Sequence, residues 1–252
     1  MKRREVTGLV VILVVLLLLL GGGYWYSKTM EPLPAEEAGA GAATDAAVVQ
    51  TAPATGVANQ QYKFTTVDLS GIANTTVKTV FADCPDMPIG EVTLGGVPFY
   101  IPSSGGNCWW CLTRPSLVTL EIPVNVDGVR RVDTLMNSNW GREGLETTKL
   151  EFFGDKGAHF EKVLVGGVDI RDWNDLDSVN TINGTTTTEV WSGHGVKPAP
   201  FNRPARMDKQ TILLPEEFGT QKLEKIVLTD SGRPGVSRSF IYGVTVGTSP
   251  GK

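Results

Sequence analysis

The segment Leu117–Val126, with the sequence LVTLEIPVNV, decides the fold class of this chain. From Leu120 onward every second residue is apolar, and the residues between them are glutamate, proline and asparagine. Successive side chains of a strand point to opposite faces, so this alternation gathers the apolar side chains on one face. The segment therefore predicts a β-strand that is buried on one face and exposed on the other. Ile226–Leu228 and Phe240–Val246 show the same alternation.

Short segments rich in β-branched and aromatic residues recur along the chain from Gln61, separated by Gly, Pro, Asn and Asp, which favour turns. No segment has a clear helical period, although Gly144–Thr148 and Pro215–Gly219 could each form one helical turn. We therefore predict an all-β protein in which residues 61–248 form an antiparallel two-sheet β-sandwich of jelly-roll type. The predicted strands are Tyr62–Leu69, Thr76–Phe81, Glu91–Leu94, Val97–Ile101, Ser116–Val124, Arg130–Asn137, Thr148–Phe153, His159–Val165, Val168–Asp172, Thr186–Trp191, Gln210–Leu214, Leu223–Thr229 and Arg238–Val246.

An ordered series of short motifs runs through this region. Its members are Pro88–Gly90, Leu94–Phe99, Ile101–Pro102, Leu135–Ser138, Asp172–Trp173, Trp191–Gly193, Gln210–Ile212, Leu223–Leu228 and Ile241–Val246. In this order the series resembles bacterial galactose-binding-like β-sandwich domains of the carbohydrate-binding-module type. The resemblance covers roughly Tyr62–Gly247 and departs from the family pattern at Asn107–Cys111. It implies a non-catalytic jelly-roll domain that binds glycans or other cell-surface ligands through loops at one end, in some members with a structural calcium ion.

The amino terminus predicts a membrane anchor. Residues 6–26 form an uncharged and largely apolar segment, and a bilayer core of roughly 30 Å needs about 20 helical residues. Lys2, Arg3 and Arg4 precede it, which favours a short cytoplasmic tail of residues 1–5. A cleaved signal peptide is the alternative interpretation. Both interpretations place the later residues outside the cytoplasm, and the first predicts a single-pass protein of the cell membrane with an extracytoplasmic carboxyl-terminal domain.

Residues 27–60 are rich in Ala, Gly, Pro, Thr and Glu and contain few large apolar residues. Such a composition cannot bury enough apolar surface to offset chain entropy, so we predict a disordered linker. Residues 1–28 carry a net charge of +3, and the whole chain carries −4, so the remainder is acidic. An acidic domain without a Lys/Arg cluster is not expected to bind nucleic acid.

The stretch Cys108-Trp109-Trp110-Cys111 is the most unusual in the chain. A C-x-x-C pair can form a disulfide, supply half of a zinc site or act as a redox pair. A redox pair normally begins a helix, and no helical pattern follows here. We predict a disulfide between Cys108 and Cys111, with a bond from either one to Cys84 as the alternative, and metal binding, redox chemistry or free thiols as further alternatives.

Two groups of residues are candidates for ligand binding. Trp109 and Trp110 are adjacent in a predicted loop, where an exposed indole would offer a stacking surface to a sugar or a protein partner. The second group combines planar hydrogen-bonding side chains with a tryptophan, at and after the end of a strong predicted strand; it consists of Asn137, Asn139, Trp140 and Arg142. Trp173 and Trp191 match positions that are structural in the family that the chain resembles.

An oxygen-rich cluster follows, formed by Asp169, Asp172, Asn174, Asp175 and Asp177. Calcium takes six to eight oxygen ligands, so these side chains are candidate calcium ligands, with a solvated acidic turn as the alternative. We expect no other cofactor. The sequence thus predicts a non-catalytic binding module for carbohydrate or another cell-surface ligand. A structural protein that docks a partner in the cell envelope is the first alternative, and a hydrolase is the second.

Overall fold

The structure is a computed structural model that describes residues 61–81, 84–106, 108–110, 118–174, 181–194, 204–232 and 237–249. All of them belong to one compact unit, Ala54–Lys252. Within this described part, no helix combines the length and the apolar character that a membrane crossing requires. The predicted tail, membrane span and linker fall on residues 1–60, outside the described residues, and stay predictions.

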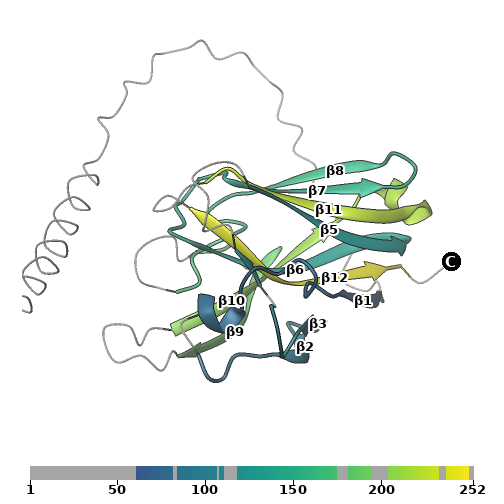
Figure 1. The fold of residues 1–252 in the computed structure, drawn as a ribbon. Helices are drawn as coiled ribbons and strands as arrows, with labels where there is room; N and C mark the ends of the chain where they lie inside the picture. Colours follow the sequence, from purple (N-terminus) through teal and green to yellow (C-terminus); the bar gives the residue numbers. More distant parts are fainter. Residues whose placement is uncertain are drawn as a thin grey trace, which may run out of the picture. The chain divides into compact units, whose positions relative to one another are not determined.

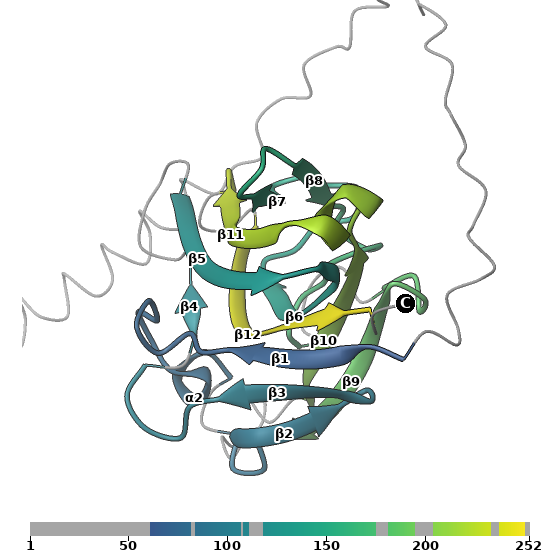
Figure 2. The same cartoon turned by 90° about the vertical axis from the view of Figure 1, so that its right-hand side faces the viewer.

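The strands in the described ranges form antiparallel sheets, of which the two larger ones face each other (Figures 1 and 2). The six-stranded sheet has the order β1-β12-β6-β10-β9, and β4 pairs with β12 beyond the end of β1. The four-stranded sheet has the order β5-β11-β7-β8, and β2 and β3 form a separate hairpin. The strands are β1 (Lys63–Val67), β2 (Gly90–Leu94), β3 (Val97–Ile101), β4 (Trp109–Trp110), β5 (Val118–Asp127), β6 (Val129–Asn139), β7 (Thr148–Gly154), β8 (His159–Leu164), β9 (Thr187–His194), β10 (Pro204–Leu213), β11 (Lys222–Asp230) and β12 (Arg238–Thr248).

The period-two alternation that predicted these strands is borne out in β5. Leu120 and Ile122 are buried, whereas Thr119, Glu121 and Pro123 are exposed. The predicted all-β class with antiparallel sheets is therefore confirmed.

Two hydrophobic cores lie on opposite faces of the six-stranded sheet. The first lies between the two large sheets and contains Ile122, Leu150 and Ile226 of the smaller sheet against Val132 and Val244 of the larger one. The second lies on the other face, where the β2–β3 hairpin packs against the sheet; it includes Val97, Phe99, Leu135, Phe240 and Tyr242. Burial on both faces explains why β6 and β12 are buried at nearly every position, polar residues included.

The structure corrects two predicted strands. Thr76–Phe81 does not form a strand but contains the one-turn helix α2 (Val77–Val80). Thr76 caps this turn, since its hydroxyl accepts a hydrogen bond from the Thr79 backbone N–H at 3.1 Å. The turn buries Val77 and Val80, which lie three residues apart on one helical face. Val168–Asp172 makes isolated bridges and is not a strand.

Of the two predicted helical turns, one is confirmed and the other is wrong. Pro215–Gly219 was expected to form a helical turn, and Glu216–Thr220 is the 3₁₀ helix η2. Gly144–Thr148 contains no helix and leads directly into β7. The predicted strands Glu91–Leu94 and Val97–Ile101 form the hairpin β2–β3, where Gly95 and Gly96 both have positive φ, as a two-residue hairpin turn of type I′ requires.

Candidate functional site

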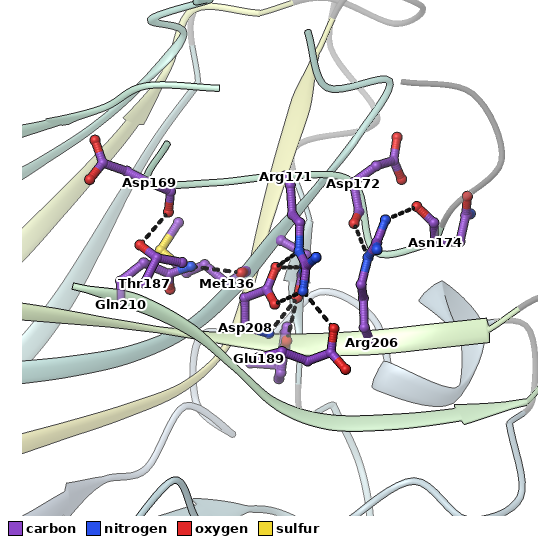
Figure 3. Close-up of polar contacts among 12 residues, drawn as sticks. Met136, Asp169, Arg171, Asp172, Asn174, Thr187, Glu189, Arg206, Asp208 and Gln210 are labelled. Atoms are coloured by element: carbon purple, nitrogen blue, oxygen red, sulfur yellow. Dashed lines mark hydrogen bonds and ion pairs between the residues drawn. The ribbon is translucent and has the colours of Figure 1, made fainter. Parts of the chain in front are cut away.

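A buried charge network joins the segment between β8 and β9 to the six-stranded sheet (Figure 3). Arg171 donates hydrogen bonds to both carboxylate oxygens of Asp208 in β10, from Nε to Oδ2 at 2.8 Å and from Nη2 to Oδ1 at 2.7 Å. Nη2 also donates to Oε2 of Glu189 in β9 at 2.7 Å. Burial alone would lower the pKa of Arg171, but the hydrogen bonds and charges of Asp208 and Glu189 outweigh burial and raise it. The guanidinium therefore stays charged inside the domain.

Asn137 of β6 completes this network. Its Nδ2 donates to Oδ2 of Asp208 at 2.8 Å. Its Oδ1 accepts from the Asp208 backbone N–H at 3.2 Å and from the Tyr242 hydroxyl at 2.7 Å. The residue is 0% exposed. The prediction that Asn137 contacts a ligand is therefore wrong, because its amide is consumed by buried partners and does not reach the surface.

The residues that follow β6 form an exposed turn at the end of the sandwich. Trp140 is 42% exposed and Arg142 is exposed, while Asn139 is half-buried. Oδ1 of Asn139 accepts a hydrogen bond from Nε1 of Trp173 at 2.5 Å. Of the four predicted ligand residues, Asn139, Trp140 and Arg142 thus lie at least partly exposed on one short segment. Asn137 is the one that is buried.

Trp140 has an unusual backbone conformation. Its φ is +56°, and among the described residues only Asn125 is another non-glycine residue with positive φ. This left-handed region costs a residue with a Cβ roughly 1–2 kcal/mol. A bulky residue in such a conformation persists only where the surrounding structure imposes it, and such residues concentrate at functional sites.

Asp172 lies directly beneath this turn. It is 6% exposed, and nearby backbone N–H groups, those of Gly141, Asn174, Trp140 and Trp173, act to lower the pKa of its carboxyl. Burial raises the pKa of Asp172 to about 6, because the loss of hydration outweighs the stabilisation by these four N–H groups. Oδ1 has no hydrogen-bond partner among the described residues. The charged form of this buried carboxylate is therefore costly.

We expect Asp172→Asn to change how stability depends on pH. An aspartate in an unfolded chain titrates near ~3.9, whereas Asp172 titrates at about 6 in the folded domain. A raised folded pKa means that the folded state binds the proton more tightly, so the contribution of this group to stability falls as the pH rises from about 4 to about 6. Between pH 4 and pH 7 the free energy of unfolding of the variant should therefore rise by about 1–3 kcal/mol relative to that of the native protein. Urea unfolding of both proteins at the two pH values measures this, and a difference that does not vary with pH contradicts it.

The predicted calcium ligands do not share a centre in the described part of the chain. The carboxylate of Asp169 accepts from the Val165 backbone N–H at 3.1 Å and pairs with Lys162 at 3.0 Å. Backbone N–H groups near the Asp172 carboxyl act to lower its pKa, and such groups do not coordinate a cation. The backbone oxygen of Asn174 accepts from Arg206 at 2.6 Å. No group of three or more His, Cys, Asp or Glu among the described residues could hold a metal ion, and Asp175 and Asp177 lie outside them.

The C-x-x-C stretch lies partly within the described residues. Cys84 and Cys108 are buried thiols in the second core, and Cys111 lies outside the described residues. Because both are free, the structure contains no disulfide between Cys84 and Cys108, and the predicted disulfide from Cys108 to Cys111 is not seen. Burial raises the pKa of the Cys108 thiol, which disfavours the thiolate that redox or metal chemistry requires.

Trp109 is buried rather than exposed. It forms the short strand β4 with Trp110, pairs with Ile241 of β12 and is 8% exposed within the first core. The interpretation of Trp109 as an exposed stacking surface is therefore wrong, since pairing with β12 turns its indole into the sandwich. The side chain of Trp110 lies outside the described residues.

The sequence singles out Trp140 as a candidate but does not indicate the buried Arg171–Asp208 pair or the buried state of Asp172. The Arg171–Asp208 pair joins residues 37 positions apart, and the sequence predicts Asp172 as a calcium ligand. Neither role has a local sequence signal, because each depends on which segments meet in space.

Comparison with protein-family models finds no family that matches this chain, and no curated protein has significant similarity to it.

Proposed function

We propose that this chain is a membrane-anchored, extracytoplasmic binding module that recognises a carbohydrate through Trp140 and does not catalyse a reaction. The observation that supports this most is the 42% exposure of an indole whose backbone is constrained in a costly conformation. An exposed and rigid indole can stack on the apolar face of a sugar ring at little cost in conformational entropy.

The neighbours of Trp140 supply the polar part of such a site. Arg142 is exposed two residues further along the same turn, and the half-buried Asn139 precedes Trp140. Guanidinium and amide groups hydrogen-bond to sugar hydroxyls, so a stacking surface flanked by these groups fits the composition of a small polar-ligand site. We propose in addition that the sandwich is a galactose-binding-like jelly roll, and that residues 6–26 tether it to the membrane through the 27–60 linker.

The alternative, an assembly protein that docks an envelope partner through Trp109 and Trp110, has less support. Trp109 is part of the core and cannot serve as an exposed anchor. Trp140 therefore carries the proposal, with a carbohydrate as its ligand.

Trp140→Ala is expected to weaken carbohydrate binding by more than about tenfold, since it removes the central stacking surface of the site. The full chain, purified in a detergent without a sugar head group, would be screened against a panel of immobilised glycans. Each glycan retained would then be titrated against the native protein and the variant.

Leu213→Ala is the matched control. Leu213 is an apolar residue with the same exposed fraction, 42%, and it lies at the end of β10, away from the turn after β6. We expect this variant to bind with native affinity. Equal affinities of the native protein and Trp140→Ala for every retained glycan would contradict the proposed site, and retention of no glycan by the native protein would contradict the proposed function.

A further inference from the structure

Asn139 is the last residue of β6 and precedes Trp140, and the orientation of its side-chain amide follows from a single contact. Nε1 of Trp173 lies 2.5 Å from Oδ1 of Asn139. An indole N–H only donates hydrogen bonds, whereas an amide accepts through its oxygen and donates through its nitrogen. The atom that faces Trp173 must therefore be the amide oxygen, and the amino group of Asn139 is the part that remains for other partners.

Trp173 is held firmly, so it fixes this orientation of the amide. Its carbonyl accepts a hydrogen bond from the Arg206 backbone N–H at 2.9 Å. The Arg206 guanidinium donates to the carbonyls on either side, to that of Asp172 at 3.1 Å and to that of Asn174 at 2.6 Å (Figure 3). The indole packs edge-on against Phe81 in the second core, with the ring centroids 5.4 Å apart. Backbone and ring are both anchored, which makes the indole N–H a donor of fixed position.

The amino group of Asn139 is available to a ligand. Within the described ranges its Nδ2 makes no hydrogen bond, and it is not one of the buried polar atoms that lack a partner. A side chain that is already held in one conformation loses little entropy when it binds. Asn139 therefore offers two preorganised N–H donors, while its oxygen is engaged by Trp173.

Arg142 adds a second group that only donates. It is exposed on the same turn. In the part of the chain that the structure describes, its guanidinium forms no ion pair or hydrogen bond, although Glu143 and Glu146 are exposed on the same turn. A guanidinium presents its N–H groups in a planar fork that matches a carboxylate. The charge of Arg142 is therefore available to a ligand.

Two groups that donate and do not accept favour a ligand group that accepts and does not donate. A sugar hydroxyl does both, whereas a carboxylate only accepts. Hydrogen bonds to an ionised partner are also roughly twice as strong as neutral ones. The net charge of the chain, −4, opposes an anion at long range. At physiological salt, however, exposed charges more than about 8 Å apart are largely screened, so the contacts at Asn139 and Arg142 decide the class of ligand.

We propose that the ligand of this site is an acidic sugar, whose carboxylate is bound by the amino group of Asn139 and the guanidinium of Arg142. Trp173 is the positioning residue, because it holds the Asn139 amide in the one orientation that presents the amino group. The inference rests on the proposed function, since it concerns the site of Trp140 and names the class of its ligand.

The first measurement compares acidic glycans with their own neutral counterparts. Oligosaccharides of galacturonate, glucuronate and mannuronate are titrated against the full chain, as are the same oligosaccharides after chemical reduction of their carboxyl groups to primary alcohols. Reduction removes the carboxylate but keeps the sugar ring that stacks on Trp140. The native protein should bind at least one acidic form about tenfold or more tightly than its reduced form.

Arg142→Gln tests the contribution of the charge. Glutamine keeps two N–H donors but carries no charge. The affinity for the acidic glycan should fall by about tenfold or more, whereas the affinity for the reduced glycan should change by less than about threefold. Equal losses for the two forms would contradict a carboxylate bound at Arg142.

Asn139→Asp tests the amino group, because a carboxylate has nearly the shape of the amide and still accepts from Trp173. It removes both N–H donors and should lower the affinity for the acidic glycan by about tenfold or more. Asn125→Asp is the matched control, since Asn125 is exposed in β5 of the other large sheet and the substitution adds the same charge. It should bind within about twofold of native. If Asn139→Asp does not fold, Asn139→Ala replaces it with the same expected loss.

The positioning role of Trp173 is measured without a ligand. The chain has six tryptophans, so labelling with the heavy nitrogen isotope gives six indole N–H signals. Trp173→Phe identifies the signal of Trp173, or sequential assignment does so if this variant does not fold. Asn139→Ala removes the acceptor, so this proton should exchange with solvent about tenfold or more faster. Asn139→Asp retains an acceptor, and exchange should stay within about threefold of native.

Each result supports or overturns the inference. Equal binding of acidic and reduced glycans by the native protein, or tighter binding of the reduced forms, overturns the acidic ligand and leaves the Trp140 site in place. Equal losses in Asn139→Asp and Asn125→Asp overturn the role of the amino group. Unchanged exchange of the Trp173 proton in Asn139→Ala overturns the positioning role. If no glycan binds in either form, the proposed function fails and the acidic ligand with it, whereas the exchange measurement still decides whether Trp173 holds the amide.

Discussion

Asp208→Ala is expected to lower the free energy of unfolding by about 3–5 kcal/mol. Asp208 is fully buried and accepts both hydrogen bonds of the Arg171 guanidinium as well as one from Nδ2 of Asn137. Its removal leaves a buried cation and a buried amide that have lost their main acceptor, and each pays the cost of lost hydration. Urea denaturation at pH 7, followed by tryptophan fluorescence, measures the change.

Glu189→Ala is the matched control because it removes the other carboxylate that Arg171 contacts. The Glu189 side chain is 44% exposed, so solvent screens this contact and can replace it. We expect a loss below about 1 kcal/mol. If Asp208→Ala and Glu189→Ala lower the free energy of unfolding by the same amount, burial does not determine how much the Arg171–Asp208 pair contributes to stability.

The double variant Arg171→Met, Asp208→Leu separates the cost of an isolated charge from the net contribution of the pair. Replacing a buried ion pair by apolar residues of similar volume is often neutral or stabilising. We expect the double variant to be at least about 2 kcal/mol more stable than Asp208→Ala. Asn137 loses its Asp208 acceptor in both variants, so the difference between them reports on Arg171 together with the apolar volume that leucine fills at position 208.

Trp109→Ala is expected to cost about 3–5 kcal/mol of stability and to leave ligand binding unchanged while the domain is folded. Trp109 fills part of the core between the two sheets, where Ile241, Val244 and Leu120 also lie. The substitution leaves a large cavity, since a close-packed interior relaxes only in part. Thermal unfolding measures the stability, and the glycan titration is repeated at a temperature where the variant is folded.

Trp140→Ala supplies the comparison, because it is the same substitution at an exposed tryptophan. We expect it to change stability by less than about 1 kcal/mol and to abolish most of the binding. Trp109→Ala should therefore mainly lower stability, whereas Trp140→Ala should mainly lower the affinity for the ligand. If the Trp109→Ala domain is stable but no longer binds its ligand, the prediction is wrong and Trp109 takes part in ligand binding.

The sequence by itself determined the all-β class and much of the strand placement. Alternation in Leu117–Val126 identifies a half-buried strand because strand side chains alternate between two faces, and β5 confirms it. The β-rich segments Glu91–Leu94 and Val97–Ile101 are likewise confirmed, as β2 and β3. Both signals are local, and a local conformational preference is readable from neighbouring residues.

Only the tertiary structure decided which polar and aromatic residues face solvent. Asn137 ends a predicted strand and was expected near the surface, but its partners Asp208 and Tyr242 are 71 and 105 residues away. Trp109 was expected to be exposed in a loop, but it pairs with a strand more than 100 positions later. A sequence pattern shows that a residue lies on a strand or a turn, but it does not show what covers that element. The six-stranded sheet is covered on both faces, so the burial of its polar residues depends on contacts that form only when distant segments meet.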